Sequence, residues 1–317
     1  MEGPRLFRFT LALTVISSTL CAQPPQGGRG GGGPAQQLMR DGKMDEALKV
    51  YQDQLKATPD SLAANRGAGM VLDLMGNGAD ARKYFQKAID LAGDPAAKAA
   101  SQRDMAMSYA FSGDCKNTVK YEQMVYDYWK TRESAEPGNA FYQEGEMANE
   151  AARVCIDSGD LDTAARMYQV GHDAGIKEPE DLHPGRKALW EFRTEHALAR
   201  IAARRGNKAD AQKHVELARK ALNDIQAKDA GLYQQQQAFL PYLSGYVALY
   251  TGDYKTALAD LQKANANDPF FQCLIGMTYE KLGEKDKAME AYRKAATSIG
   301  HNPPAAFSIP FARKKIG

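Results

Sequence analysis

The 317-residue sequence lacks most of the patterns that mark enzymes and metal proteins. It has four cysteines and two tryptophans, and it contains no CxxC pair, no HExxH motif and no GxSxG elbow. A zinc ribbon, a dithiol redox centre, a zinc protease and a serine hydrolase are therefore disfavoured. The five histidines form no close pair with a carboxylate at a metal-binding spacing. We expect no enzyme activity, no metal and no cofactor.

Net charge is also nearly absent. The chain carries 41 Lys and Arg residues against 39 Asp and Glu residues, a formal charge of +2. No strong field draws such a chain to nucleic acid, so we expect no nucleic-acid partner. Hydrophobic residues make up 44% and charged residues 25%, as in an ordinary soluble globular protein. This composition excludes a wholly disordered chain and a polytopic membrane protein.

Long apolar runs are missing except at residues 9–20. Arg5 and Arg8 precede this run and Ala22 follows it, which is the pattern of an export signal cleaved after a small residue. The run is shorter than the roughly 20 apolar residues that cross a membrane. We therefore expect an exported protein, periplasmic or secreted, with no stable membrane span after cleavage. A lipid anchor at Cys21 is the less favoured alternative.

One ten-residue element recurs along the rest of the chain. Each copy has a Gly, a short polar run, an Ala and, four residues after the Ala, an aromatic or aliphatic residue; the third copy departs from this pattern. The copies begin at Gly42, Gly76, Gly113, Gly159, Gly206, Gly252 and Gly283. The Gly suits the left-handed end of one helix, and the Asp or Asn that often follows suits the cap of the next. The element therefore predicts a pair of helices, and no alternating strand pattern appears.

This element resembles the tetratricopeptide repeat (TPR). The first two glycines are 34 residues apart, which is the TPR period. Gly69, Gly245 and Gly276 precede later copies by seven residues, where the first TPR helix carries its glycine. The resemblance covers residues 35–300. It implies an all-α, right-handed α-solenoid of about seven TPR-like helix pairs, with the first helices on the concave face.

The chain is thus expected to have four parts. These are a signal peptide at residues 1–22, a disordered Gly/Pro-rich linker at 23–34, the TPR solenoid at 35–302 and a C-terminal cap or tail at 303–317. The prolines of the last part argue against a long helix there. A cap over the last repeat and a loose tail both remain open.

Two cysteines fall on adjacent levels of the expected stack. Cys115 opens the second helix of the third repeat, and Cys155 lies near the end of the first helix of the fourth. In an exported protein we predict a Cys115–Cys155 disulfide, with two buried free thiols as the alternative. Cys273 is expected in the core.

Basic and aromatic residues follow the first helices at spacings of three and four, on the expected concave face. The candidate peptide-binding residues are Arg66, Arg103, Arg153, Arg193, His196, Arg200, Arg204, Phe239, Tyr242, Tyr246 and Tyr250. Arginine pairs with carboxylates through two hydrogen bonds, and tyrosine offers rigid amphipathic area. The pattern predicts a groove for a protein or peptide partner, and acidic side chains would suit the arginines. The alternative is that the tyrosines pack between repeats and the arginines are solvated.

These expectations favour an exported TPR scaffold that binds protein segments on its concave face, as an adaptor or assembly factor in the cell envelope. Two other hypotheses stay open. One is an enzyme or small-molecule receptor with a site in the enlarged middle repeats, and the other is a structural module of a homo-oligomer.

Overall fold

The structure is a computed structural model that describes residues 33–264 and 268–317. The predicted signal peptide and all but the last two residues of the predicted linker lie outside these described residues. Within the described ranges every regular element is a helix, which confirms the predicted all-α class. No helix in this part of the chain is long and apolar enough to cross a membrane.

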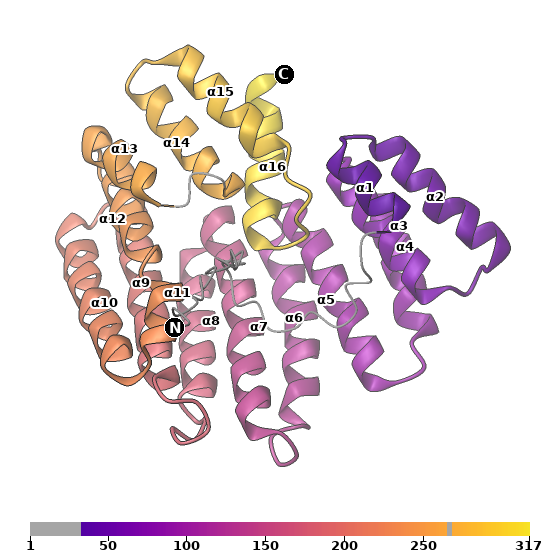
Figure 1. Ribbon diagram of the computed structural model, residues 1–317, viewed down its shortest axis with the longest axis horizontal. Coiled ribbons are helices and arrows are strands. Elements are labelled where there is room, and N and C mark those ends of the chain that lie inside the picture. Colours follow the sequence, from indigo (N-terminus) through magenta and orange to yellow (C-terminus); the bar gives the residue numbers. More distant parts are fainter. Residues whose placement is uncertain (1–32, 265–267) are drawn as a thin grey trace, which may run out of the picture.

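The helices follow one another in hairpin pairs that stack into a curved solenoid (Figure 1). The first helices are α1 (Pro34–Arg40), α3 (Leu62–Leu74), α5 (Pro95–Phe111), α7 (Pro137–Ser158), α9 (Arg186–Arg204), α12 (Phe239–Tyr250) and α14 (Pro269–Lys281). The second helices are α2 (Met44–Ala57), α4 (Gly78–Leu91), α6 (Cys115–Lys130), α8 (Leu161–Gly175), α10 (Lys208–Lys228), α13 (Tyr254–Lys263) and α15 (Lys285–Ala296). Two helices stand outside the pairs, α11 (Ala230–Gln236) and α16 (Pro303–Ile316).

A glycine with a positive φ lies between the two helices of each pair. The seven φ values run from 68° at Gly113 to 92° at Gly159, in the region that L side chains rarely adopt. In several pairs the next residue caps the second helix: the Asp160 side chain, for example, accepts a hydrogen bond from the Thr163 N–H. The seven predicted helix pairs are therefore present.

Close approach explains the glycines inside the first helices. A Cβ at Gly69 in α3 would lie 2.7 Å from the Phe85 ring of α4, and one at Gly276 in α14 would lie 2.6 Å from Tyr292 of α15. Successive first helices also contact one another: α3 contacts α5, and α9 contacts α12. They therefore form the inner layer of the stack, and the second helices form the outer layer.

A disulfide joins two neighbouring levels of the stack. Cys115 at the start of α6 is bonded to Cys155 near the end of α7, with their Cα atoms 4.8 Å apart. Both cysteines are buried. Cys273 on α14 is a buried free thiol.

The expectation that prolines prevent a long helix after residue 302 is wrong, because α16 has 14 residues. Pro303 and Pro304 stand in its first turn, where a backbone N–H has no partner within the helix anyway. Pro310 lies inside the helix and removes one hydrogen bond. Burial of Ile309 and the neighbouring alanines compensates for that loss.

Helix α16 bridges the last pair and first helices from earlier in the solenoid. On one side Phe307 and Phe311 pack against Phe270 and Tyr292 of the last pair, with ring centroids 5.6 and 6.0 Å apart. On the other side α16 contacts α5 and α7. In Figure 1 it runs between the last pair and the early first helices. This placement has the geometry of a cap, and it also ties the last pair to α5 and α7.

Candidate functional site

The candidate site lies on the neighbouring first helices α7, α9 and α12. We call it the arginine–tyrosine cluster and define it as Arg153, His196, Arg200, Arg204, Tyr242, Tyr246 and Tyr250. Spacings of three and four residues place the members from one helix on one face, and the stacking of α9 against α12 brings the two sets together.

Arg200 is the buried centre of this cluster, with 5% of its surface exposed. Its Nη2 donates to the Tyr168 hydroxyl of α8 at 2.6 Å, and its Nη1 donates to the Tyr242 hydroxyl at 3.4 Å. Tyr242 is itself buried and stacks on Phe271 at 4.7 Å between ring centroids. The guanidinium group is thus held by neutral oxygens rather than by a carboxylate.

The other two arginines of the cluster, Arg153 and Arg204, lie at its edge and are half-buried. Arg204 donates from Nη1 to the Tyr246 hydroxyl at 3.5 Å and lies 4.9 Å from the centre of the Tyr250 ring. Arg153 lies 4.5 Å from the centre of the Phe270 ring, and its buried Nε has no hydrogen-bond partner. Both groups keep donor capacity for a ligand.

Asp157 is the acid beside these arginines, and one of its carboxylate oxygens is buried without a partner. Burial raises its pKa to about 6, and the lowering effect of Arg153, Arg200 and Arg204 does not cancel this rise. Burial and the nearby guanidinium groups hold the pKa of His196 well below its ordinary value. His196 is therefore neutral at pH 7, and its Nε2 has no partner.

Three of the predicted arginines have a different environment. Arg66 pairs with Asp104, Arg103 with Glu150 and Arg193 with Glu146. In each case the acid lies on the next or preceding first helix, so the charge is matched within the inner layer. The predicted peptide-binding residues thus divide into arginines in matched ion pairs and the arginine–tyrosine cluster. Phe239, half-buried at the start of α12, packs beside the cluster.

Sequence reasoning missed three residues of the site. Tyr168 is the aromatic of the fourth repeat copy, and the repeat alone indicated a packing role for it. Asp157 lies four residues after Arg153, so the same helical spacing could have found it. Phe270 follows Pro269 at the start of α14, and no sequence signal connects it with α7.

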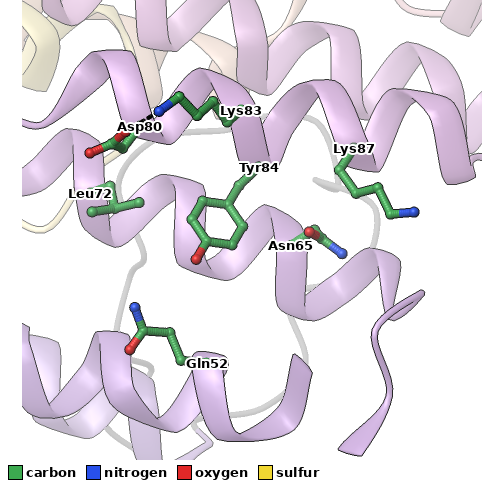
Figure 2. A pocket seen from close by; sticks show the side chains of 7 residues that line it. All are labelled: Gln52, Asn65, Leu72, Asp80, Lys83, Tyr84 and Lys87. Atoms are coloured by element: carbon green, nitrogen blue, oxygen red, sulfur yellow. Dashed lines mark hydrogen bonds and ion pairs between the residues drawn. The ribbon is translucent and has the colours of Figure 1, made fainter. Parts of the chain in front are cut away.

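A separate surface hollow of about 450 Å³ lies between α2 and α4, over α3. Its lining residues, which Figure 2 shows, are Gln52, Asn65, Leu72, Asp80, Lys83, Tyr84 and Lys87. Lys83 is paired with Asp80 at 2.7 Å and Lys87 with Asp60 at 3.1 Å. The hollow faces outward between two second helices, and its charges are already matched. It is therefore a weaker candidate than the cluster.

Metal ligands do not gather in the part of the chain that the structure describes. No group of three or more His, Cys, Asp and Glu side chains there could hold a metal ion. The arginine–tyrosine cluster itself consists of guanidinium donors, phenolic hydroxyls, aromatic rings and the neutral His196.

Comparison with known proteins identifies the repeats. Tetratricopeptide repeat models match residues 35–98 and 271–299. No curated protein matches the sequence. Among solved structures, the putative kinesin light chain TPR-like repeats of Podosopora anserina are 19% identical, with 59% of this chain and 90% of that chain covered and a TM-score of 0.45.

Two further structures cover more of the chain. A tetratricopeptide repeat protein from Parabacteroides merdae is 14% identical, with 88% of this chain and 96% of that chain covered and a TM-score of 0.45. The apo form of RapI is 12% identical, with 89% and 96% covered and a TM-score of 0.49. From the repeat matches and the helix pairs, residues 35–98 and 271–299 are tetratricopeptide repeats within an all-α TPR solenoid.

Proposed function

We propose that this chain is an exported TPR scaffold that holds an acidic segment of a partner protein at the arginine–tyrosine cluster. Its role is that of an adaptor or assembly factor in the cell envelope. A charge imbalance carries the proposal: among the described residues, Arg153, Arg200 and Arg204 have no carboxylate within 4 Å. Asp157 is the nearby acid, so the cluster keeps an excess of positive charge.

Physical chemistry favours an acidic ligand at such a place. A charged group taken out of water is stabilised only when it is paired and hydrogen-bonded. A carboxylate at the edge of the cluster would accept charge-assisted bonds from Arg153 and Arg204, which are the stronger kind of hydrogen bond. The half-buried Tyr250 ring adds rigid apolar area with little loss of side-chain entropy on binding, whereas Tyr242 and Tyr246 are buried between the helices.

Photo-cross-linking in cells that make the full chain tests this proposal. A photoreactive phenylalanine replaces Tyr250, at the edge of the cluster, or Val170, which is exposed on the outer helix α8. We expect position 250 to capture an acid-rich segment of an envelope protein, and position 170 not to capture it. Capture only at position 170 would contradict the site, and capture of cytosolic proteins alone would contradict export.

Substitutions at the neighbouring residues Arg204 and Arg205 provide a test variant and its matched control. Arg204→Gln should reduce capture at position 250, because it removes one of the two accessible cations. Arg205→Gln makes the same chemical change one residue later, at an exposed arginine paired with Asp162. We expect Arg205→Gln to leave capture unchanged.

Binding of the acidic segment should also depend on pH. As the pH falls from 7.5 through 6, Asp157 takes up a proton and the positive charge of the cluster rises. Carboxylates of the ligand, with an ordinary pKa near 4, stay ionised in this range. Affinity should therefore increase by roughly tenfold between pH 7.5 and 5.5, the effect of about 1.4 kcal/mol.

The Asp157→Asn variant separates this effect from other titrations. The variant should bind the segment more tightly than wild type at pH 7.5 and should show little further change at pH 5.5. Isothermal titration calorimetry at both pH values gives the comparison. A variant whose affinity follows the wild-type pH dependence would exclude Asp157 as the titrating group.

A further inference from the structure

Three exposed apolar side chains are aligned on the outer layer of the stack. They are Met124 on α6, Val170 on α8 and Leu217 on α10, each at least 36% exposed. Each lies eleven residues after the positive-φ glycine of its pair, so all three occupy the same position on successive second helices (Figure 1). We call these three side chains the apolar row. Single apolar residues are ordinary on a protein surface, but their repetition at one position forms a patch.

The apolar row is confined to the middle of the stack. The second helices of the other four pairs carry a charged, exposed residue at the same position: Asp53, Lys87, Lys263 and Lys294. Charged residues are the usual occupants of such an exposed position. The outer face of α6, α8 and α10 therefore differs from the rest of the outer layer.

Opposite charges flank the apolar row on its two sides. Four residues before it lie Lys120, Arg166 and Lys213, which are exposed and have no carboxylate within 4 Å among the described residues. Three residues after it lie Asp127 on α6 and Asp173 on α8, each of which accepts from a glutamine at 2.8 Å. At 1.5 Å per residue, the cations lie about 6 Å from the row and the anions about 4.5 Å from it on the other side.

A surface with this charge pattern is complementary to a copy of itself. If a second chain is turned about a two-fold axis that runs along the apolar row, the two rows meet and the cations of one chain face the anions of the other. A two-fold axis across the row would instead place cations against cations. On α10, Lys220 replaces the aspartate, so the match of opposite charges comes from α6 and α8.

We propose that a second copy of this chain docks on this face and forms a two-fold dimer through the apolar row. Such a symmetric interface uses the same surface on both chains and is the commonest form of oligomer. In this dimer Arg166 of each chain faces Asp173 of the partner subunit. The face belongs to the convex outer layer, so the contact is limited in area and the dimer dissociates on dilution. The inner layers stay uncovered, and the inference does not rest on the binding of an acidic segment.

Light scattering of the full chain over a concentration series tests this dimer. The mass should rise from that of one chain toward that of two, and added salt should weaken the association because it screens exposed charges. Val170→Asp should weaken the association at least roughly tenfold, because it places an unpaired charge in the contact. Leu182→Asp is the matched control: it makes the same change at an exposed leucine in the loop between α8 and α9. It should leave the association unchanged.

An exchange of charges tests the two-fold arrangement itself. Arg166→Glu alone and Asp173→Lys alone each bring like charges together across the axis, so each should weaken the association. The double variant Arg166→Glu/Asp173→Lys restores opposite charges and should recover association at the wild-type level. Circular dichroism confirms that each variant is folded.

A wild-type mass equal to one chain at every concentration would overturn the proposal. Dimers that Val170→Asp leaves intact, or a double variant that associates as poorly as the single variants, would overturn it as well. A photoreactive phenylalanine at position 170 should capture a second copy of the chain, and this gives an independent result. Dimers that form without capture of an acidic segment at position 250 would end the proposed function and leave this inference standing.

Discussion

Replacing Trp190 with alanine is expected to lower the free energy of unfolding by about 4 kcal/mol. Trp190 on α9 is fully buried, and its indole ring lies directly against the backbone at Gly145 of α7 and Gly175 of α8. One side chain thus fills the space between three consecutive helices. Its removal leaves a cavity that the surrounding helices cannot close without moving together, so loss of dispersion contacts adds to the lost burial.

Trp129→Ala is the matched control for this prediction. Trp129 lies near the end of α6 and is only half-buried, so the same deletion removes fewer contacts. Urea denaturation followed by circular dichroism measures both variants. The Trp190→Ala midpoint should fall far more than the Trp129→Ala midpoint. Equal decreases in the two midpoints would contradict the claim that Trp190 stabilises the packing of α7, α8 and α9.

Removal of the Cys115–Cys155 disulfide should lower the free energy of unfolding by a similar amount. The bond closes a segment with a sequence separation of 40 residues, for which the loss of unfolded-chain entropy predicts about 4 kcal/mol of stabilisation. The Cys115→Ala/Cys155→Ala double variant should therefore unfold at a lower urea concentration than oxidised wild type. Wild type treated with a reductant should shift in the same direction.

Cys273→Ala separates the loss of the bond from the loss of a buried sulfur. Cys273 is buried and unbonded, so its replacement removes packing alone. Its effect should be smaller than that of the double variant and should not depend on reductant. An oxidised wild-type protein that unfolds at the same midpoint with and without reductant would show that the bond adds no stability.

Much of the fold could be predicted because its strongest constraints are local. A positive φ between helices requires a residue without a side chain, so Gly159 and its counterparts mark the turns. Close approach explains Gly69, where a Cβ would collide with Phe85. Helix α16 could not be predicted, because the prolines that oppose a helix are local whereas contacts that stabilise it come from residues more than 200 positions away, such as the Leu74 carbonyl that accepts from Arg313.

The candidate site was only partly predictable for a related physical reason. Helical spacing places Arg193 and Arg200 on one face, but it does not reveal what lies opposite on the next helix. Arg193 meets Glu146, whereas Arg200 meets the hydroxyls of Tyr168 and Tyr242. That difference depends on how α7, α8 and α12 stack around α9, and it separates a matched ion pair from a cluster with excess positive charge.

The affinity of the segment captured at position 250 for three full-length chains tests the central claim most directly. Titration calorimetry at neutral pH would compare wild type, Arg204→Gln and Arg205→Gln. Loss of a charge-assisted hydrogen bond of about 1.5 to 3 kcal/mol predicts at least roughly tenfold weaker binding for Arg204→Gln and no change for Arg205→Gln. Wild-type binding should also weaken as salt is added. Equal affinities for all three chains would contradict the claim that the arginine–tyrosine cluster binds the partner.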